Sequence, residues 1–120
     1  MKILIFENEF AEIEPIFEVL KKDYENFEYK YFPNSQGLGP MSNALEYDKI
    51  LVDLKLSDKT RMEGFDILDE LKRLKYNMNN VAILTGHTDY ISRLSEKSLE
   101  SVVVLEKPIS FDELEIFLGL

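Results

Sequence analysis

The polar residues of this 120-residue chain that could do chemistry together follow four short apolar runs. Glu7 and Asn8 follow KILIF, Asp53 ends KILVD, Thr85 ends VAILT, and Lys107 follows VVVLE. Carboxylate and amide oxygens suit Mg²⁺, whereas a hydroxyl and an ammonium group bind phosphoryl oxygens. An aspartate beside Mg²⁺ and a lysine could itself accept a phosphoryl group. These residue types therefore favour a site for a divalent cation and a phosphoryl group, if the fold brings them together.

Alternating strands and helices would bring these residues together. The apolar runs predict strands at Lys2–Phe6, Phe27–Phe32, Lys49–Leu54, Val81–Thr85 and Val102–Leu105. Helical spacing of apolar residues predicts helices over 10–20, 65–74, 91–99 and 111–118, and a short one at Met41–Tyr47. This order predicts an α/β fold with a parallel sheet, right-handed crossovers and helices on both faces. Ligands of such sheets bind at the carboxyl ends of the strands, which is where the polar residues stand.

Local patterns refine these elements. Four of the runs are almost continuously apolar, as in strands covered on both faces, whereas FEYKYF alternates and predicts an edge strand. Pro15 interrupts the first helical pattern, so that helix either starts late or is kinked there. Ser110 and Glu113 form a capping box that begins the last helix. The acidic residues Glu9, Glu12, Glu14 and Glu18 are most simply read as a solvated helix surface.

Composition excludes several classes of protein. The chain has no cysteine and one histidine, which excludes disulfide frameworks, thiolate zinc sites and paired-histidine catalysis. Its net charge of −9 disfavours direct binding to nucleic acid. No apolar run approaches the length of a membrane span, and the N-terminus lacks the features of a signal peptide. We therefore expect one soluble, cytoplasmic domain over residues 1–120.

The motifs together resemble the receiver domain of two-component response regulators. ILIFENE is similar to the family's first strand and acidic pair, and YDKILVDLKL with MEGFDIL to its phosphoacceptor strand and following helix. AILTGHTD is similar to the strand that ends in the switch threonine, and VVVLEKPIS to the strand with the Lys-Pro pair. The resemblance covers nearly the whole chain. It implies a doubly wound, flavodoxin-like sheet of five parallel strands in the order 2-1-3-4-5.

The resemblance also implies roles for individual residues. Asp53 would be the phosphoacceptor, with Thr85 hydrogen-bonding the acyl phosphate and Lys107 pairing with it. Mg²⁺ would be the cofactor, bound directly by Asn8 and Asp53 and by the backbone carbonyl of Lys55, while Glu7 would hold a metal-bound water. The Lys107–Pro108 bond is expected to be cis, a form that only X–Pro bonds adopt readily.

The resemblance further implies partners. A histidine kinase or a histidine phosphotransfer protein would donate the phosphoryl group. The signal would leave through protein contact on the face formed by Ile91–Leu99, Val102–Leu105 and Phe111–Leu118, and a homodimer is possible. No enzymatic activity is expected beyond self-phosphorylation and dephosphorylation at Asp53.

The chain departs from the family pattern in several places. Asn8 replaces an aspartate, which leaves Glu7, Asp53 and Lys107 with a net charge of −1 and predicts weaker Mg²⁺ binding. Val104 stands where the family has an aromatic residue that swings inward on activation, a movement that a valine cannot make. The loop LSDKTRMEG is longer than usual, Leu99-Glu100-Ser101 replaces a segment of small residues, and the last helix is short.

These departures leave a second hypothesis open, a degenerate receiver that binds partner proteins without being phosphorylated. A third hypothesis is a small phosphohydrolase or phosphotransferase on a similar sheet. An aspartate phosphatase would need a second acid two residues after its nucleophile, and Lys55 occupies that position. The sequence therefore favours the phosphoryl-accepting switch over a phosphatase.

Overall fold

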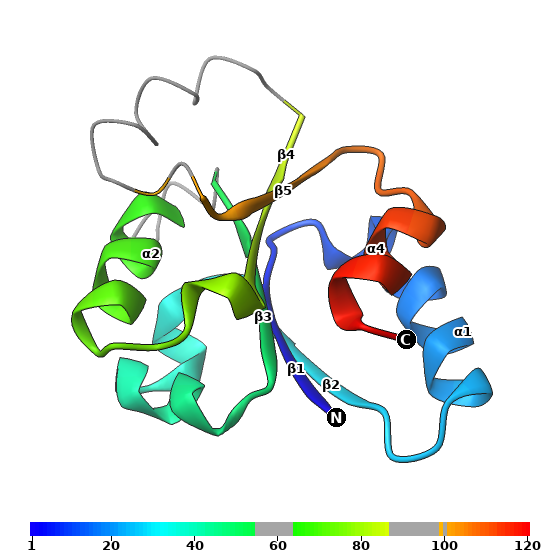
Figure 1. Ribbon diagram of the computed structural model, residues 1–120, viewed down its shortest axis with the longest axis horizontal. Helices are drawn as coiled ribbons and strands as arrows, with labels where there is room; N and C mark the ends of the chain where they lie inside the picture. Colours follow the sequence, from blue (N-terminus) through cyan, green and yellow to red (C-terminus); the bar gives the residue numbers. More distant parts are fainter. Residues whose placement is uncertain (55–63, 87–98, 100) are drawn as a thin grey trace.

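The computed structural model describes residues 1–54, 64–86, 99 and 101–120, and contains one five-stranded sheet (Figure 1). Its strands are β1 (Lys2–Phe6), β2 (Glu28–Phe32), β3 (Lys49–Asp53), β4 (Val81–Thr85) and β5 (Val103–Glu106). All neighbouring strands are parallel, and their order is β2-β1-β3-β4-β5. The predicted fold class and strand order are confirmed, with strand limits that differ from the expected ones by one residue in three cases.

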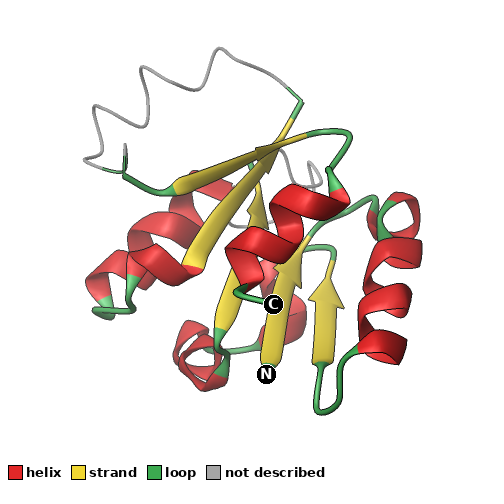
Figure 2. Cartoon of the chain, turned by 45° about the vertical axis from the view of Figure 1, so that its right-hand side comes forward, coloured by secondary structure: helices red, strands yellow, loops and turns green. Residues whose placement is uncertain are grey.

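Helices cover both faces of this sheet (Figures 1 and 2). The α-helices within the described residues are α1 (Glu14–Asp23), α2 (Gly64–Arg73) and α4 (Phe111–Leu118). Successive residues of a strand point to opposite faces, and so Ile3 and Ile5 pack with α1 and α4 while Leu4 packs with α2. Two separate apolar clusters result, one on each face, as a doubly wound sheet requires.

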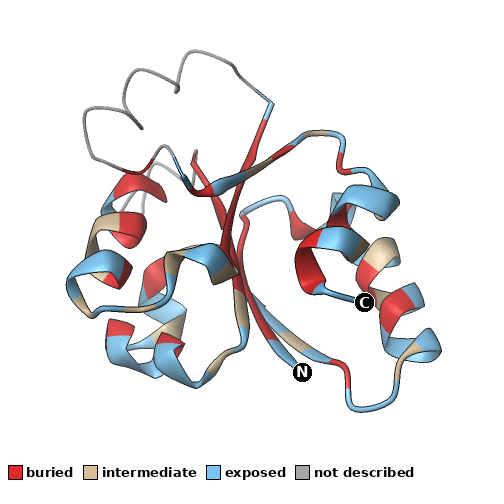
Figure 3. Cartoon of the chain, in the orientation of Figure 1, coloured by how far each residue is buried: buried red, intermediate tan, exposed pale blue. Residues whose placement is uncertain are grey.

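The inner strand β4 is buried throughout, and β1 and β3 are buried except at their first residues, Lys2 and Lys49, whereas the two edge strands are more exposed (Figure 3). β2 lies at one edge of the sheet, which confirms the position predicted from FEYKYF, although its exposure does not alternate strictly because Lys30 and Tyr31 are both exposed. β5 lies at the other edge, and the expectation that its run is covered on both faces is wrong: Val103 is 37% exposed. An edge strand has a neighbouring strand on one side alone, so its side chains are more accessible to solvent than those of an inner strand, even when its sequence is apolar.

The first helical segment begins in two steps. A 3₁₀ turn over Phe10–Glu12 precedes α1, which starts at Glu14, so that Pro15 lies in the first helical turn. In that position the missing N–H of proline removes no helical hydrogen bond. Of the two alternatives left open by the sequence, the late start is the correct one.

The last helix has the predicted limits, Phe111–Leu118. The hydroxyl of Ser110 accepts a hydrogen bond from the N–H of Glu113 at 3.4 Å, as expected of a helix cap. Gly119 ends the helix with a positive φ of 74°, a left-handed conformation that glycine adopts without strain. Local sequence signals therefore set both ends of α4.

The connection from β2 to β3 differs from the sequence-based expectation. It contains two 3₁₀ helices, Ser35–Leu38 and Met41–Glu46, where a single short helix over Met41–Tyr47 was expected. The helix predicted over 91–99 lies outside the described residues, except for Leu99, which is buried. Among the described residues, no helix combines the length and the apolar character that crossing a membrane requires.

Candidate functional site

Three charged side chains meet at the carboxyl ends of the parallel strands. Glu7 directly follows β1, Asp53 is the last residue of β3, and Lys107 directly follows β5. The Nζ atom of Lys107 lies 2.7 Å from Oε2 of Glu7 and 3.1 Å from Oδ2 of Asp53. β4 lies between β3 and β5, so the side chain of Lys107 crosses the end of β4 to reach Asp53. The convergence expected from the sequence is present for these three residues.

Both carboxylates of this cluster are buried. Glu7 is 1% exposed and Asp53 is 4% exposed, whereas the side chain of Lys107 is 25% exposed. Burial raises the pKa of Glu7 above its ordinary value, and the nearby Asp53 carboxylate adds to this effect while Lys107 opposes it. Burial also acts to lower the pKa of Lys107, but the two carboxylates outweigh it and the pKa is raised. The cluster is thus one partly exposed ammonium group shared by two buried carboxylates.

The backbone around the cluster holds these side chains in place. The N–H of Glu7 donates to the carbonyl of Phe32 at 3.1 Å, which extends the β1–β2 pairing to the site. The N–H of Glu9 donates to Oε1 of Glu7 at 3.0 Å and orients that carboxylate. The N–H of Lys107 donates to the carbonyl of Thr85 at 2.8 Å, and the Lys107–Pro108 bond is cis, as expected.

The other predicted site residues have different positions. Thr85 ends β4 and is 4% exposed; since Asp53 pairs with Leu84, Thr85 lies one residue beyond the level of Asp53 on the adjacent strand. Asn8 is exposed and follows Glu7 at the rim of the site. Lys55 lies outside the described residues. The fold therefore places Thr85 beside the cluster and Asn8 at its edge.

The donor atoms at the site fit a hard divalent cation. Oε2 of Glu7 is buried, and the ammonium group of Lys107 is its partner at 2.7 Å. Mg²⁺ in proteins is commonly bound by one or two carboxylates together with several waters. Glu7 and Asp53 supply two carboxylates, and the described residues contain no group of three or more His, Cys, Asp or Glu arranged for a metal ion. Glu7 and Asp53 thus offer few ligand atoms, but carboxylate oxygens are of the kind that Mg²⁺ binds.

Gly64 contributes to the site through its lack of a side chain, which reasoning from the sequence did not identify. A Cβ atom on this first residue of α2 would lie 2.4 Å from the carbonyl oxygen of Asp53 and 2.5 Å from Cα of Leu54. Both contacts are with backbone and are too short to exist. Glycine thus lets the start of α2 pack directly against the end of β3.

A small cavity beside Lys107 was also missed. Its volume is about 110 Å³, and the residues that line it are Glu7, Glu9, Glu12, Ile13, Ile16, Lys107, Pro108 and Ile109. Glu9 and Glu12 are exposed, as expected of a solvated surface, and they also border the site. The cavity is bordered by the segment after β1 and by the segment after β5, and no local pattern in either segment reveals it.

This arrangement allows specific chemistry. A buried carboxylate beside an ammonium group and at the open end of a parallel sheet can act as a nucleophile toward phosphorus, since the ammonium group stabilises negative charge on phosphoryl oxygens. The threonine hydroxyl on the neighbouring strand can donate a hydrogen bond to the same group.

Solved structures with the same fold were found by comparison. The signal receiver domain of the DNA-binding response regulator merR from Colwellia psychrerythraea 34H is 23% identical, with a TM-score of 0.77, covering 99% of this chain and 95% of that one. The signal receiver domain of a Luxo repressor protein from Vibrio parahaemolyticus is 25% identical, with a TM-score of 0.72, covering 98% and 86%. The receiver domain of NtrX from Brucella abortus is 19% identical, with a TM-score of 0.74, covering 98% and 94%.

Comparison at the level of sequence gives the family. No curated protein matches the chain closely enough to count as a relative. The family model of the response regulator receiver domain matches residues 3–118, which includes every described helix and all five strands except Lys2, the first residue of β1. The match covers the cluster of Glu7, Asp53 and Lys107 as well. The chain therefore belongs to the family of response regulator receiver domains.

Proposed function

We propose that this receiver domain accepts a phosphoryl group on Asp53 and passes the signal on through protein contact. The observation that carries the proposal is the buried Asp53 carboxylate, 3.1 Å from the ammonium group of Lys107 at the carboxyl end of the sheet. A buried carboxylate is costly to maintain, and at the end of a strand it adds nothing that the sheet requires. Its retention beside a lysine and a threonine supports a chemical role.

The transfer step follows from this geometry. The phosphoryl donor is the phosphohistidine of a kinase or of a phosphotransfer protein. A bond forms between phosphorus and a carboxylate oxygen of Asp53 while the bond from phosphorus to the imidazole nitrogen breaks, and the electron pair of that bond stays on the nitrogen. Lys107 stabilises the charge on the phosphoryl oxygens, and Thr85 hydrogen-bonds the product. No other substrate is turned over.

Mg²⁺ is the proposed cofactor. Asp53 and Asn8 would bind it directly with the backbone carbonyl of Lys55, and Glu7 would hold a metal-bound water. When bound, the ion neutralises negative charge on the phosphoryl oxygens. Since Asn8 is uncharged, and since Lys107 already contacts both buried carboxylates, we expect Mg²⁺ to bind more weakly here than at a site with a third carboxylate.

The cavity beside Lys107 is the proposed docking place of the phosphoryl donor. It lies between the start of α1 and the segment after β5, and Ile13, Ile16 and Ile109 give it an apolar wall next to the reacting groups. A partner that packs on this wall would bring its phosphohistidine toward Asp53. We propose that this partner is a histidine kinase or a phosphotransfer protein.

The proposed exit for the signal is the face that includes β5 and α4. Val103 is 37% exposed there, and Ile116 is 79% exposed, a large value for an apolar side chain. The remaining part of the expected face, residues 91–98, lies outside the described residues. A downstream protein, or a second copy of the chain in a homodimer, could bind this face. Direct contact with nucleic acid is not part of the proposal, and the site of action is the cytoplasm.

The alternative function is a receiver that binds partners without phosphorylation. The observation in its favour is the double contact of Lys107, which pairs with both Glu7 and Asp53 and leaves the three groups with a net charge of −1. Such a cluster could hold a signalling-competent shape without a phosphoryl group. Val104, which replaces the family's aromatic residue, agrees with this alternative.

One experiment separates the two functions. The chain is incubated with acetyl phosphate and Mg²⁺, and its intact mass is compared with that of Asp53→Asn and of Asp112→Asn, a matched change on the exposed surface of α4. A gain of about 80 Da, the mass of one phosphoryl group, is expected for the parent and for Asp112→Asn but not for Asp53→Asn. Absence of labelling in all three chains at any Mg²⁺ concentration would instead support the phosphorylation-independent function.

A further inference from the structure

The edge of the sheet formed by β2 carries backbone groups that no described residue binds. The N–H of Glu28 donates to the carbonyl of Met1 at 2.9 Å, and the carbonyl of Phe32 accepts from the N–H of Glu7 at 3.1 Å. In a parallel pair, alternate residues direct both backbone groups to the neighbouring strand. Residues 28, 30 and 32 therefore face β1, and the N–H and C=O groups of Tyr29 and Tyr31 point away from the sheet.

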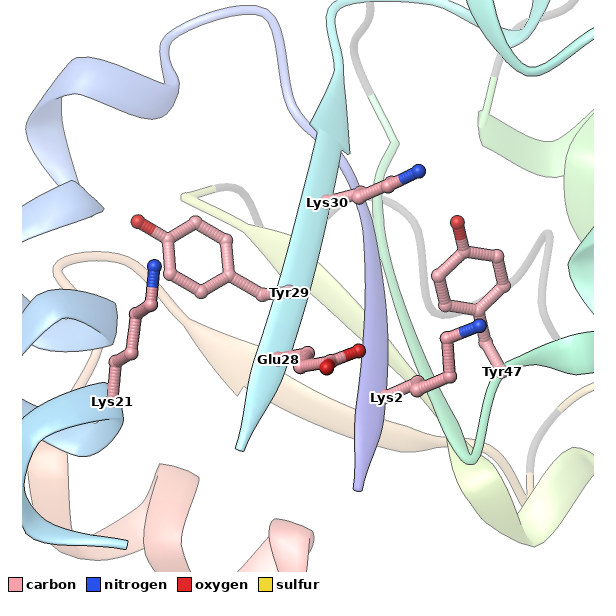
Figure 4. Close-up of a pocket in the computed structure, with 6 residues that line it drawn as sticks. All are labelled: Lys2, Lys21, Glu28, Tyr29, Lys30 and Tyr47. Atoms are coloured by element: carbon pink, nitrogen blue, oxygen red, sulfur yellow. The ribbon is translucent and has the colours of Figure 1, made fainter. Parts of the chain in front are cut away.

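A cavity of about 240 Å³ lies around this open edge (Figure 4). The residues that line it are Lys2, Lys21, Glu28, Tyr29, Lys30 and Tyr47. Figure 4 shows Lys21 and Tyr29 on one side of β2, and Lys2, Lys30 and Tyr47 on the other. The apolar clusters agree with this division, because Tyr29 packs with the α1 side of the sheet and Tyr47 with the α2 side. The positive charges thus lie on both faces of one exposed strand.

Three lysines and two carboxylates lie at this edge, because Glu18 accepts a hydrogen bond from the hydroxyl of Tyr29 beside the lining residue Glu28; the local net charge is +1, in a chain whose net charge is −9. Glu28 pairs in register with Lys2, so the one carboxylate of the cavity lies beside a lysine. A compact anion could not contact Lys21 and Lys30 together, since the strand separates them (Figure 4). A strand added to the edge would place successive side chains on opposite faces and so reach both lysines.

We propose that the β2 edge binds an extended acidic peptide segment of a partner protein, which adds a sixth strand to the sheet. The outward N–H and C=O groups of Tyr29 and Tyr31 supply the backbone pairing. Lys21 and Lys30, which lie on opposite sides of β2, select for acidic side chains on the two faces of the added strand. A second copy of this chain is a poorer occupant, because it would place its own Lys21 and Lys30 against those of the first copy.

The test uses the ¹⁵N-labelled chain and a capped heptapeptide that carries glutamate on both faces of a strand, with valine and threonine elsewhere. We expect the amide protons of Tyr29 and Tyr31 to become protected from exchange with solvent when the peptide binds, because they gain acceptors. The amide of Lys30 already faces β1 and should not change. Two control peptides accompany the titration: one with lysine in place of glutamate, and one with N-methyl groups on alternate backbone amides.

Charge variants test the role of the lysines. Lys21→Glu and Lys30→Glu should each weaken peptide binding by about threefold to fivefold, the size of one exposed ion pair. Lys22→Glu is the matched control on the same helix; this residue does not line the cavity, and binding should stay within about twofold. Asp53→Asn should bind the acidic peptide as the parent does, so this test does not depend on phosphorylation.

Three results would overturn the proposal. The first is that Tyr29 and Tyr31 gain no protection at millimolar peptide. The second is that the basic peptide binds as tightly as the acidic one, which would remove the argument from charge. The third is that the N-methylated peptide binds equally well, which would show attraction to lysines without pairing of strands. Unchanged protection of Lys30 in each variant shows that the sheet is intact.

Discussion

The two ends of the parallel strands use polar residues in different ways. At the carboxyl end, Glu7, Asp53 and Lys107 are bound to one another, and both carboxylates are buried. At the amino end, polar groups bind elements of the fold: the N–H of Lys2 donates to Oδ2 of Asp48 at 2.7 Å, and Nζ of Lys49 donates to Oδ1 of Asn80 at 2.9 Å. The contacts at the carboxyl end hold charged side chains against one another, whereas the contacts at the amino end attach loops to strands.

The difference separates residues kept for chemistry from residues kept for structure. A hydrogen bond between a strand and a loop fixes the loop, and it costs little because its donor and acceptor lie near solvent. A buried cluster of three charges pays a desolvation cost that its internal attraction does not reliably recover. The carboxyl-end cluster is therefore weak evidence for stability and stronger evidence for a function, which agrees with the proposed phosphoryl acceptance by Asp53.

The largest expected effect concerns the close packing of the carboxyl end. Gly64→Ala would force its Cβ into the backbone at Asp53 and Leu54, and we expect a loss of about 3 kcal/mol in the free energy of unfolding. Gly86→Ala is the matched control, since its Cβ would lie 3.9 Å from Cβ of Lys107, an ordinary contact, and should change stability by less than about 1 kcal/mol. Urea unfolding measures both. Equal effects of the two changes would contradict the packing at Gly64.

The next effect compares one lysine at each end of the sheet. Lys107→Met leaves Glu7 and Asp53 buried without their shared ammonium group, and should cost about 2 kcal/mol at neutral pH. Lys49→Met removes one hydrogen bond to Asn80 and a cation–π contact with Phe117, and should cost about 1 kcal/mol or less. If Lys49→Met lowers the free energy of unfolding more than Lys107→Met does, the proposed difference between the two ends of the sheet is contradicted.

A pH series sharpens the electrostatic part of the comparison. The pKa of Glu7 in the folded chain is raised above 4.5, so Glu7 favours folding below that pH and this contribution falls as pH rises through the folded pKa. Glu7→Gln, which is neutral at every pH, should therefore gain stability relative to the parent between pH 4 and pH 7. The measurement is the difference in free energy of unfolding between the two chains across that range.

Glu70→Gln provides a control of opposite sign. Pairing with Arg73 lowers the pKa of Glu70, and so Glu70 favours folding above its ordinary pKa and loses this contribution as pH falls. The Gln variant should lose stability relative to the parent as pH rises through the acidic range. If the stability differences of the two variants change with pH in the same direction, burial does not control the pKa of Glu7.

The smallest effect concerns the amino end. The hydroxyl of Tyr76 donates to the carbonyl of Tyr47 at 2.7 Å, and burial raises the pKa of Tyr76 to about 12. Its contribution to stability is present below pH 10 and is lost as pH rises from 10 to 12. Tyr76→Phe should cost about 1 kcal/mol at neutral pH, and the absorbance titration of tyrosinate should lose one late step. An unchanged titration curve would contradict this assignment.

Much of the fold was predictable because its signals are local. The apolar runs and helical spacings identified all five strands, the edge position of β2 and the limits of α4. These signals reflect the alternation of side chains along a strand and the period of a helix, which nearby residues alone determine. The convergence of Glu7, Asp53 and Lys107 was predictable for a related reason, since parallel strands end at one edge of the sheet.

Tertiary structure decided how the site is built. Lys107 bridges Glu7 as well as Asp53, Gly64 packs against the backbone at Asp53, and a cavity opens beside the lysine. The exposure of Val103 likewise depends on what covers the edge strand β5, and its apolar sequence predicted the opposite. Each of these features depends on the distance between segments that are remote in the chain. That distance is set by how the strands twist and how the helices pack, and no short stretch of residues encodes it.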